Sequence, residues 1–501
     1  MLGVRVQRWT LRYFAVALAA LALALALVAA GVSYPAAPIL APATLVTVHL
    51  LTLGWLTPLM LGALSQLVPV ITRRQLASDG APGPALALLV VGLGAMLVGF
   101  LALGGGPLAA PFGTAADLAL PIGGALVVSG VGVNAVNLAV TLWRARPLPL
   151  SGRYAAAALA FLAATVLLGL TLAATLTVPT LLPPVLAATL AGEGLPFHVL
   201  AGVGGWFTLT AMGVGLKLLA MFTLAPEERG RSGDAAFLLT AVGLGLAFVA
   251  GLAATFAPAA RALGMLADMG LGAATLGVAV FVADMAIMYR QRRRRALELN
   301  ARFGAWALAL LALALGWGLV ARLAGGGMAA FAPVVALALM GWLSGLGLSQ
   351  LYKIVPFLTW IERYGARMGR ERVPRVQDLV REGQAKPWFV LWFVGALVLS
   401  LAVAAPAPDL ARASALALLI ALAGIAWELA HSRRVRPEIL AAGNGAGTGD
   451  SAGAGSGASV GSNAAAAAAV PLGRSAALPR PAPAPLTPTT KGGANHGNER
   501  R

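Results

Sequence analysis

The chain has 501 residues, of which 59% are hydrophobic and 11% charged, and its 36 Lys and Arg against 18 Asp and Glu give a formal net charge of +18. This composition lies far outside that of water-soluble globular domains and indicates an integral membrane protein. Because the chain contains no cysteine, thioether-linked heme, iron–sulfur clusters and thiolate copper sites are excluded.

Long apolar segments follow one another along most of the chain. A hydrocarbon core about 30 Å thick needs roughly twenty apolar residues per helix, and segments without polar–apolar alternation predict helices. The first segment follows Arg5, Arg8 and Arg12 and is predicted to be an uncleaved span. We predict an all-α polytopic membrane protein with about twelve transmembrane helices, centred near residues 22, 57, 94, 128, 165, 210, 246, 276, 313, 345, 396 and 420.

Two connections have unusual sequences. Residues 179–195 are apolar but contain three prolines, which predicts a re-entrant or interfacial segment. Residues 374–386, PRVQDLVREGQAK, predict a short amphipathic helix on the membrane surface.

Basic residues gather in alternate connections. Arg and Lys follow every even-numbered span, whereas the odd-numbered connections contain little more than Arg261, Arg322 and Arg412. Because short cytoplasmic loops collect basic residues, we predict a multi-pass protein of the plasma (inner) membrane with both termini in the cytoplasm. Topology and attraction to the lipid bilayer then explain the net charge, and no nucleic-acid partner is required.

The composition divides the chain into two parts. Residues 1–436 are predicted to form a twelve-helix membrane domain. Residues 437–501 are rich in Gly, Ala, Ser, Pro and Thr and predict a disordered cytoplasmic tail.

A Gly-Trp pair precedes a Thr by the same spacing in three places: GWLTPLMLGALSQLVPVIT (54–72), GWFTLTAMGVGLKLLAMFT (205–223) and GWLSGLGLSQLYKIVPFLT (341–359). These copies fall on predicted spans two, six and ten, which run in the same direction. We therefore predict three pseudo-repeated four-helix units, at about 10–145, 150–290 and 300–432, around an axis normal to the membrane. The alternative is coincidence in a chain rich in Leu and Gly.

Two of the four histidines lie just before Gly-Trp pairs. His49 precedes Gly54 by five residues and His198 precedes Gly205 by seven, so a helical rise of about 1.5 Å per residue places both at nearly one depth. Imidazole binds heme iron and copper, and residues on facing helices commonly hold a cofactor. His49 and His198 are therefore candidate cofactor and metal ligands. The competing interpretation is that each only hydrogen-bonds to a neighbouring helix.

Three other polar residues fall within the predicted spans. Lys217 and Lys353 occupy equivalent positions in their copies, near the cytoplasmic end, where long side chains reach the interface. Asp284 is a candidate partner for either lysine in a proton or ion path.

Taken together, the twelve spans, the threefold pattern and the histidines of spans two and six resemble the catalytic subunit I of heme–copper oxidases. The segment MGWLSGLGLSQLYKIVPFL is similar to the C-type oxidases and the nitric-oxide reductases, in which an H-x-H precedes a Gly-Trp and a Tyr and a Pro follow. The likeness covers about residues 10–432. It implies that His49 is an axial ligand of a low-spin heme and that His198 is a copper ligand. Heme b and copper are the implied cofactors, and membrane or cytochrome subunits the implied partners.

The chain also departs from that family. Two further ligand histidines would fall at Val334 and Ala336, and predicted span seven contains no histidine. The resemblance therefore implies a divergent relative that binds heme and transfers electrons without reducing oxygen, and it leaves enzymatic activity open. The alternative is a transporter or channel-like protein that keeps the same scaffold without a redox cofactor.

Overall fold

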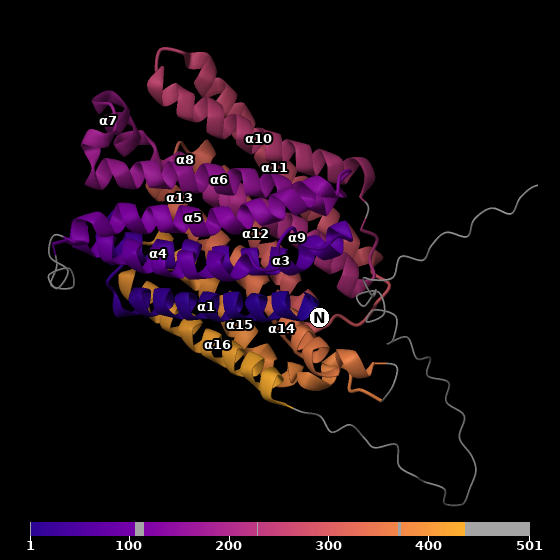
Figure 1. The fold of residues 1–501 in the computed structure, drawn as a ribbon. Coiled ribbons are helices and arrows are strands. Elements are labelled where there is room, and N and C mark those ends of the chain that lie inside the picture. Colours follow the sequence, from indigo (N-terminus) through magenta and orange to yellow (C-terminus); the bar gives the residue numbers. More distant parts are fainter. Residues whose placement is uncertain (1, 106–114, 228, 369–371, 436–501) are drawn as a thin grey trace, which may run out of the picture. The chain divides into compact units, whose positions relative to one another are not determined.

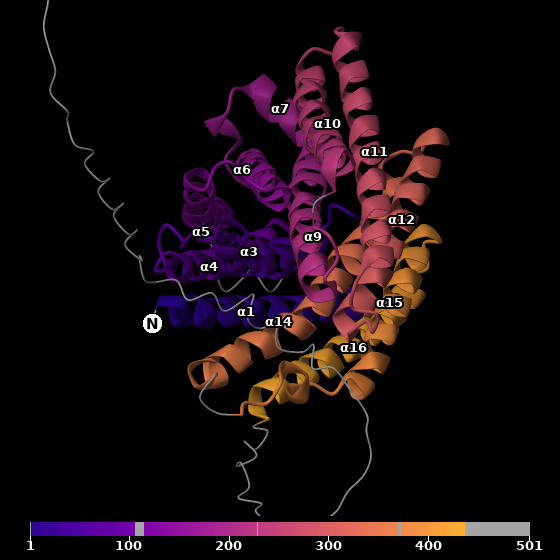
Figure 2. The same ribbon diagram turned by 90° about the vertical axis from the view of Figure 1, so that its right-hand side faces the viewer.

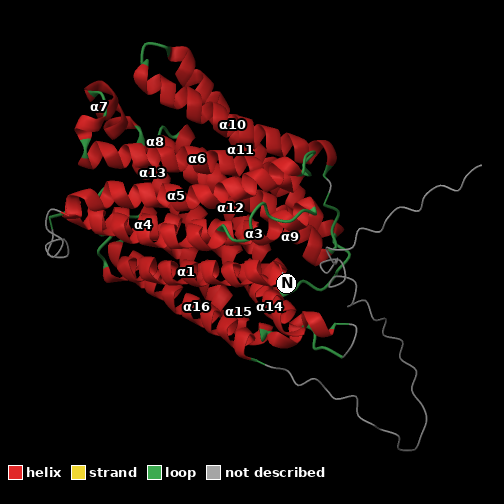
Figure 3. Ribbon diagram, in the orientation of Figure 1, coloured by secondary structure: helices red, strands yellow, loops and turns green. Residues whose placement is uncertain are grey.

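The computed structural model describes residues 2–105, 115–227, 229–368 and 372–435. Within them, every element of regular secondary structure is a helix (Figure 3). In these ranges, twelve helical segments are long and apolar enough to cross a membrane, and each predicted centre falls within one of them. The prediction of an all-α polytopic protein with about twelve spans is confirmed. The tail predicted at 437–501 lies outside the described residues.

Among the described residues, nine of these segments are single helices and three combine α-helix with π-helix. Figures 1 and 2 draw the helices as ribbons from two sides. The single helices are α1 (Leu2–Ala30), α4 (Pro82–Leu103), α5 (Ala115–Arg144), α6 (Leu150–Thr177), α10 (Gly230–Phe256), α11 (Arg261–Gln291), α12 (Leu299–Leu323), α15 (Glu382–Ala404) and α16 (Pro408–Arg434). The composite spans are α2 (Pro42–His49), η1 (Leu50–Leu56) and α3 (Thr57–Thr72); α8 (Leu195–Val199), η4 (Leu200–Thr208) and α9 (Leu209–Thr223); and α13 (Met328–Ala336), η5 (Leu337–Ser344) and α14 (Gly345–Tyr364).

The proline-rich connection between α6 and α8 forms one 3₁₀ turn, η3 (Pro179–Leu181), and the short helix α7 (Pro184–Glu193). Ten residues of α-helix are too short to cross a bilayer. The segment is therefore a connection and not a thirteenth span.

The prediction of a short amphipathic helix at 374–386 is wrong. The structure forms only the 3₁₀ turn η7 (Val376–Leu379) there, and α15 already begins at Glu382. The apolar side chain of Leu379 is buried against Trp360 and Tyr364 of α14, and the indole of Trp360 donates a 2.6 Å hydrogen bond to the carbonyl of Pro374. These contacts hold the segment on α14.

The three π-helical segments coincide with the three Gly-Trp pairs. η1, η4 and η5 each contain one pair, and Trp55, Trp206 and Trp342 are at most 1% exposed. The glycines permit close contact with the preceding span. A Cβ atom would lie 2.7 Å from Ala20 Cβ at Gly54, 2.3 Å from Phe161 Cγ at Gly205 and 2.6 Å from Leu310 Cδ1 at Gly341. Each Gly-Trp pair therefore packs against the first helix of its own predicted unit.

The tryptophans also link the composite spans to one another. Trp55 Nε1 donates a 2.9 Å hydrogen bond to Ser344 Oγ, and Trp206 Nε1 donates a 3.4 Å bond to Thr57 Oγ1. Both acceptors lie three residues after the glycine of another Gly-Trp pair. Trp342 Nε1 is buried and has no hydrogen-bond partner within the described part of the chain. The Trp55–Ser344 bond thus joins span two to span ten, and the Trp206–Thr57 bond joins span six to span two. In both bonds the tryptophan of one copy contacts the same position of another copy.

Ser344→Ala is expected to destabilise the protein by about 1 kcal/mol, because the buried indole N–H of Trp55 loses its acceptor. Ser349→Ala is the matched control, since Ser349 is equally buried but bonds only to the carbonyl of Gly345 in its own helix. Thermal unfolding of the detergent-solubilised chain measures both variants. An equal loss of stability in the two variants would show that the Trp55–Ser344 hydrogen bond adds nothing to the stability of the protein.

Candidate functional site

His49 and His198 occupy equivalent places in their spans. His49 is the last residue of α2, directly before η1, and His198 lies in α8, two residues before η4. Both side chains are partly buried. π-Helical segments inside α-helices are frequent at functional sites, because the extra residue changes the direction of the neighbouring side chains. The two histidines therefore lie where a π-helical segment changes the direction of their side chains.

The imidazole of His49 is fixed by its own helix. Its Nδ1 lies 2.7 Å from the carbonyl oxygen of Leu45, so the ring nitrogen donates and the carbonyl accepts. The ring packs against Phe100, with 4.7 Å between ring centroids. A backbone bond at Nδ1 fixes the tautomer that leaves the lone pair on Nε2, which is how histidine ligands are commonly oriented.

His198 lies against the backbone of α6. A Cβ atom at Gly169 would be only 2.7 Å from His198 Cε1, so the absence of a side chain there makes room for the ring. His198 Nδ1 is buried and has no hydrogen-bond partner among the described residues. Each predicted ligand thus lies beside a π-helical segment of its own span.

The third composite span has apolar residues at the corresponding places. Val334 and Ala336 lie in α13, just before η5. No group of three or more His, Cys, Asp or Glu side chains within the described ranges is placed to hold a metal ion. His49 and His198 are therefore the two imidazoles that the composite spans offer. Two imidazoles suit an axial pair or a two-coordinate ion, and they do not suit a complete oxygen-reducing centre.

The polar residues predicted within the spans all form ion pairs, but not with one another. Lys217 Nζ lies 2.6 Å from Glu227 Oε2, and Asp284 Oδ1 lies 3.3 Å from Arg229 Nη2. The pairing of Asp284 with Lys217 or Lys353 is therefore wrong. Glu227 and Arg229 both belong to the connection that follows α9, which supplies opposite charges closer to these side chains.

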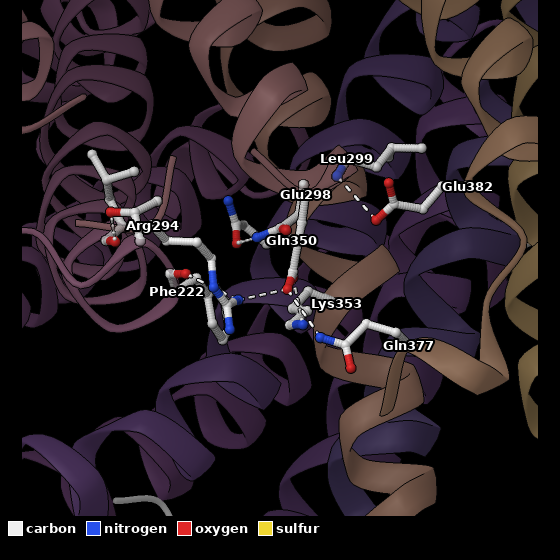
Figure 4. A network of polar contacts seen from close by, with 11 residues as sticks. Phe222, Arg294, Glu298, Leu299, Gln350, Lys353, Gln377 and Glu382 are labelled. Carbon is white, nitrogen blue, oxygen red and sulfur yellow. Dashed lines mark hydrogen bonds and ion pairs between the residues drawn. The ribbon is translucent and has the colours of Figure 1, made fainter. Parts of the chain in front are cut away.

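Lys353 belongs to a network centred on Glu298 (Figure 4). The carboxylate of Glu298 accepts contacts from Lys353 Nζ at 2.5 Å, Arg294 Nη1 at 2.6 Å and Gln377 Nε2 at 3.3 Å. Sequence reasoning missed Glu298 as well as Glu227. The sequence feature that could have identified them is a lone or paired acidic residue within a connection rich in arginine.

A small cavity lies beside this network, between α9, α11, α12 and α14. Its volume is about 20 Å³, and Asn300, Gln350, Tyr289 and Trp342 are among its lining residues. A volume of roughly 10–15 Å³ on this scale is enough for one water molecule. The cavity therefore suits one or two water molecules and no larger substrate.

Comparisons with known proteins agree with the fold. No family model and no curated protein matches the chain. Among solved structures, a chain of a heme–copper terminal oxidase dimer, determined by cryo-EM, matches with a TM-score of 0.51 and 13% sequence identity. The match covers 87% of this chain and 84% of that chain. At this identity the likeness shows the fold alone: the chain is a twelve-span membrane protein with a scaffold similar to that of a heme–copper terminal oxidase.

Proposed function

We propose that this chain is a redox protein of the membrane that binds one metal centre through His49 and His198. The placement of both imidazoles just before equivalent π-helical segments is the observation that carries the proposal. The orientation of His49 by Leu45 and the unpartnered Nδ1 of His198 fit a pair of ligands. The oxidase-like scaffold adds support for heme b or copper as the group bound.

The proposed role is electron transfer without oxygen reduction. A bound heme b or copper ion supplies one-electron redox chemistry. In this role His49 and His198 hold the centre, and Phe100 covers one ring with apolar surface. A full oxygen-reducing centre needs further histidines, and Val334 and Ala336 stand at two of the places where the C-type oxidase resemblance would put them.

We further infer that the three helical units, at about 10–145, 150–290 and 300–432, form an internal repeat. The matching π-helices, the Gly-Trp packing and the tryptophan hydrogen bonds between copies support this inference. The basic residues that follow each even-numbered span favour a plasma-membrane protein with cytoplasmic termini, and the oxidase scaffold favours cytochrome or membrane partner subunits.

An ion or proton pathway on the same scaffold is the second candidate. The water-sized cavity near Glu298 and Lys353 favours it. The pairing of Lys217, Lys353 and Asp284 with opposite charges weighs against it, because such side chains already have structural partners. Proton flux into proteoliposomes that Lys353→Met abolishes, in protein free of metal, would favour this candidate over the redox proposal.

Metal and heme analysis of the full chain tests the proposed function. The protein is expressed with ample heme precursor and copper, purified in detergent and measured by optical spectroscopy and by elemental analysis for iron and copper. We expect one redox-active centre per chain, with a spectrum that changes on reduction. A Soret band identifies heme and stoichiometric copper identifies the ion. The proposal would be overturned if the wild-type chain bound no more iron and no more copper than the double variant His49→Ala, His198→Ala.

Gly169→Ala is expected to weaken metal binding about tenfold, because the added methyl group displaces the His198 ring without removing a ligand. Gly152→Ala in the same helix is the matched control, since a Cβ atom there meets only ordinary contacts of 3.4 Å or more. Metal titration measures both. Equal affinity in the two variants would show that the position of the His198 ring does not matter for binding.

A further inference from the structure

A groove far from the histidines lies where α5 ends, α6 begins and α10 begins. Its volume is about 740 Å³. Arg146 and Arg153 line its mouth, and the partly exposed apolar side chains of Ala156, Ala157 and Phe237 line its floor. Basic side chains therefore border an open, largely apolar groove on the surface of the helices.

The arginines of the mouth are held in place by aromatic rings. The guanidinium group of Arg146 lies 3.7 Å from the centroid of the Trp143 ring, and that of Arg153 lies 5.1 Å from the centroid of Phe237. Arg153 also pairs with Asp234, whereas Arg146 has no carboxylate partner in the described part of the chain. These two arginines and one aspartate leave a net charge of +1 at the mouth.

The residues around the mouth are those typical of a membrane–water interface. Trp143 is 65% exposed and lies in the last turn of α5 beside Arg144, and Arg146 follows in the connection. Exposed tryptophan beside basic residues is typical of the membrane–water interface. Ala156 and Ala157 lie about two turns inside α6, and Phe237 lies about two turns inside α10, where acyl chains begin.

We propose that this groove binds an anionic phospholipid. Its phosphate contacts Arg146 and Arg153, and one acyl chain lies over Ala156, Ala157 and Phe237. Guanidinium groups bind phosphate through paired, charge-assisted hydrogen bonds, and basic pockets between helices bind anionic headgroups. The net charge of +1 favours an anionic lipid over a zwitterionic one, whose headgroup already carries its own cation. The inference is independent of any metal centre.

The test is a lipid titration of the delipidated full chain in detergent, followed by native mass spectrometry. Phosphatidylglycerol and phosphatidylcholine with identical acyl chains are compared, and glycerol phosphate serves as a headgroup without chains. We expect the wild-type chain to prefer phosphatidylglycerol about tenfold, because both lipids carry the phosphate and only phosphatidylcholine adds a cation beside the two arginines. Binding of glycerol phosphate as tight as that of the lipid would overturn the proposal, because the floor would then contribute nothing.

Arg146→Gln is expected to remove the preference for phosphatidylglycerol, lowering its affinity about tenfold. Arg144→Gln removes the same charge two residues away, at an exposed position outside the groove lining, and is expected to change the affinity less than about twofold. Ala157→Phe fills the floor without changing charge and is expected to weaken lipid binding to a similar extent as Arg146→Gln. Equal effects of Arg146→Gln and Arg144→Gln would contradict a specific site and indicate general surface attraction.

Discussion

His198→Ala is expected to lower the metal affinity of the purified chain by at least about a hundredfold, since the loss of one of two ligands exceeds the 10–100-fold cost of losing a supporting contact. His49→Ala is expected to have the same effect, because the proposed centre needs both imidazoles. His431→Ala is the matched control, since His431 lies in the last turn of α16 and is not a predicted ligand. Iron, copper and the optical spectrum are measured for all three variants.

The single variants also distinguish a shared site from two separate ones. A shared site predicts that each single variant loses nearly all of the bound metal and that added imidazole restores part of it. Two independent sites predict that each variant keeps about half. Full metal content in either variant would remove that histidine from the proposed ligand pair.

Gly205→Ala is expected to destabilise the protein by about 3 kcal/mol, the upper part of the usual range for overpacking. The added methyl group would lie within 2.6 Å of the Cβ, Cγ and Cδ1 atoms of Phe161, and the base of a phenylalanine cannot move away without moving α6. Because α6 also carries Gly169, the shift is expected to disturb the His198 site as well. Thermal unfolding in detergent and metal titration measure the two effects.

Gly245→Ala in α10 provides the control for the glycine substitution itself. A Cβ atom at Gly245 would meet no atom within 4 Å. In a helix interior alanine is then favoured over glycine by about 0.5–1 kcal/mol. If Gly205→Ala unfolded at the same temperature as Gly245→Ala, the close packing of η4 against α6 would not contribute to stability.

The spans could be predicted because each one must be apolar over roughly twenty consecutive residues to cross the bilayer. The exposed face of a helix in a bilayer is as apolar as its buried face, so each span is recognisable without knowledge of its neighbours. The connection at 374–386 was mispredicted because its charge pattern fits a surface helix. Its conformation depends instead on Trp360 and Leu379, which make contacts that no local pattern contains.

The sequence allowed the candidate ligands to be predicted but not the residues and helical segments around them. His49 and His198 stood out because imidazole is rare in apolar helices. The π-helical turns beside them were not predicted, since one extra residue per turn leaves the apolar composition unchanged. Gly169 gave no signal at all, because its role comes from a distant segment packed against it. The ion-pair partners Glu227 and Arg229 were missed because charged connections fold back onto the helix ends.

X-ray absorption spectroscopy of the metal-loaded chain, at the iron or copper edge, measures the proposed ligation directly. Joint ligation by His49 and His198 predicts the multiple-scattering signature of two imidazoles in the wild-type protein. It also predicts a signature of at most one imidazole in whatever metal remains after His49→Ala. Wild-type spectra without imidazole scattering, or an unchanged pair of imidazoles in His49→Ala, would contradict it.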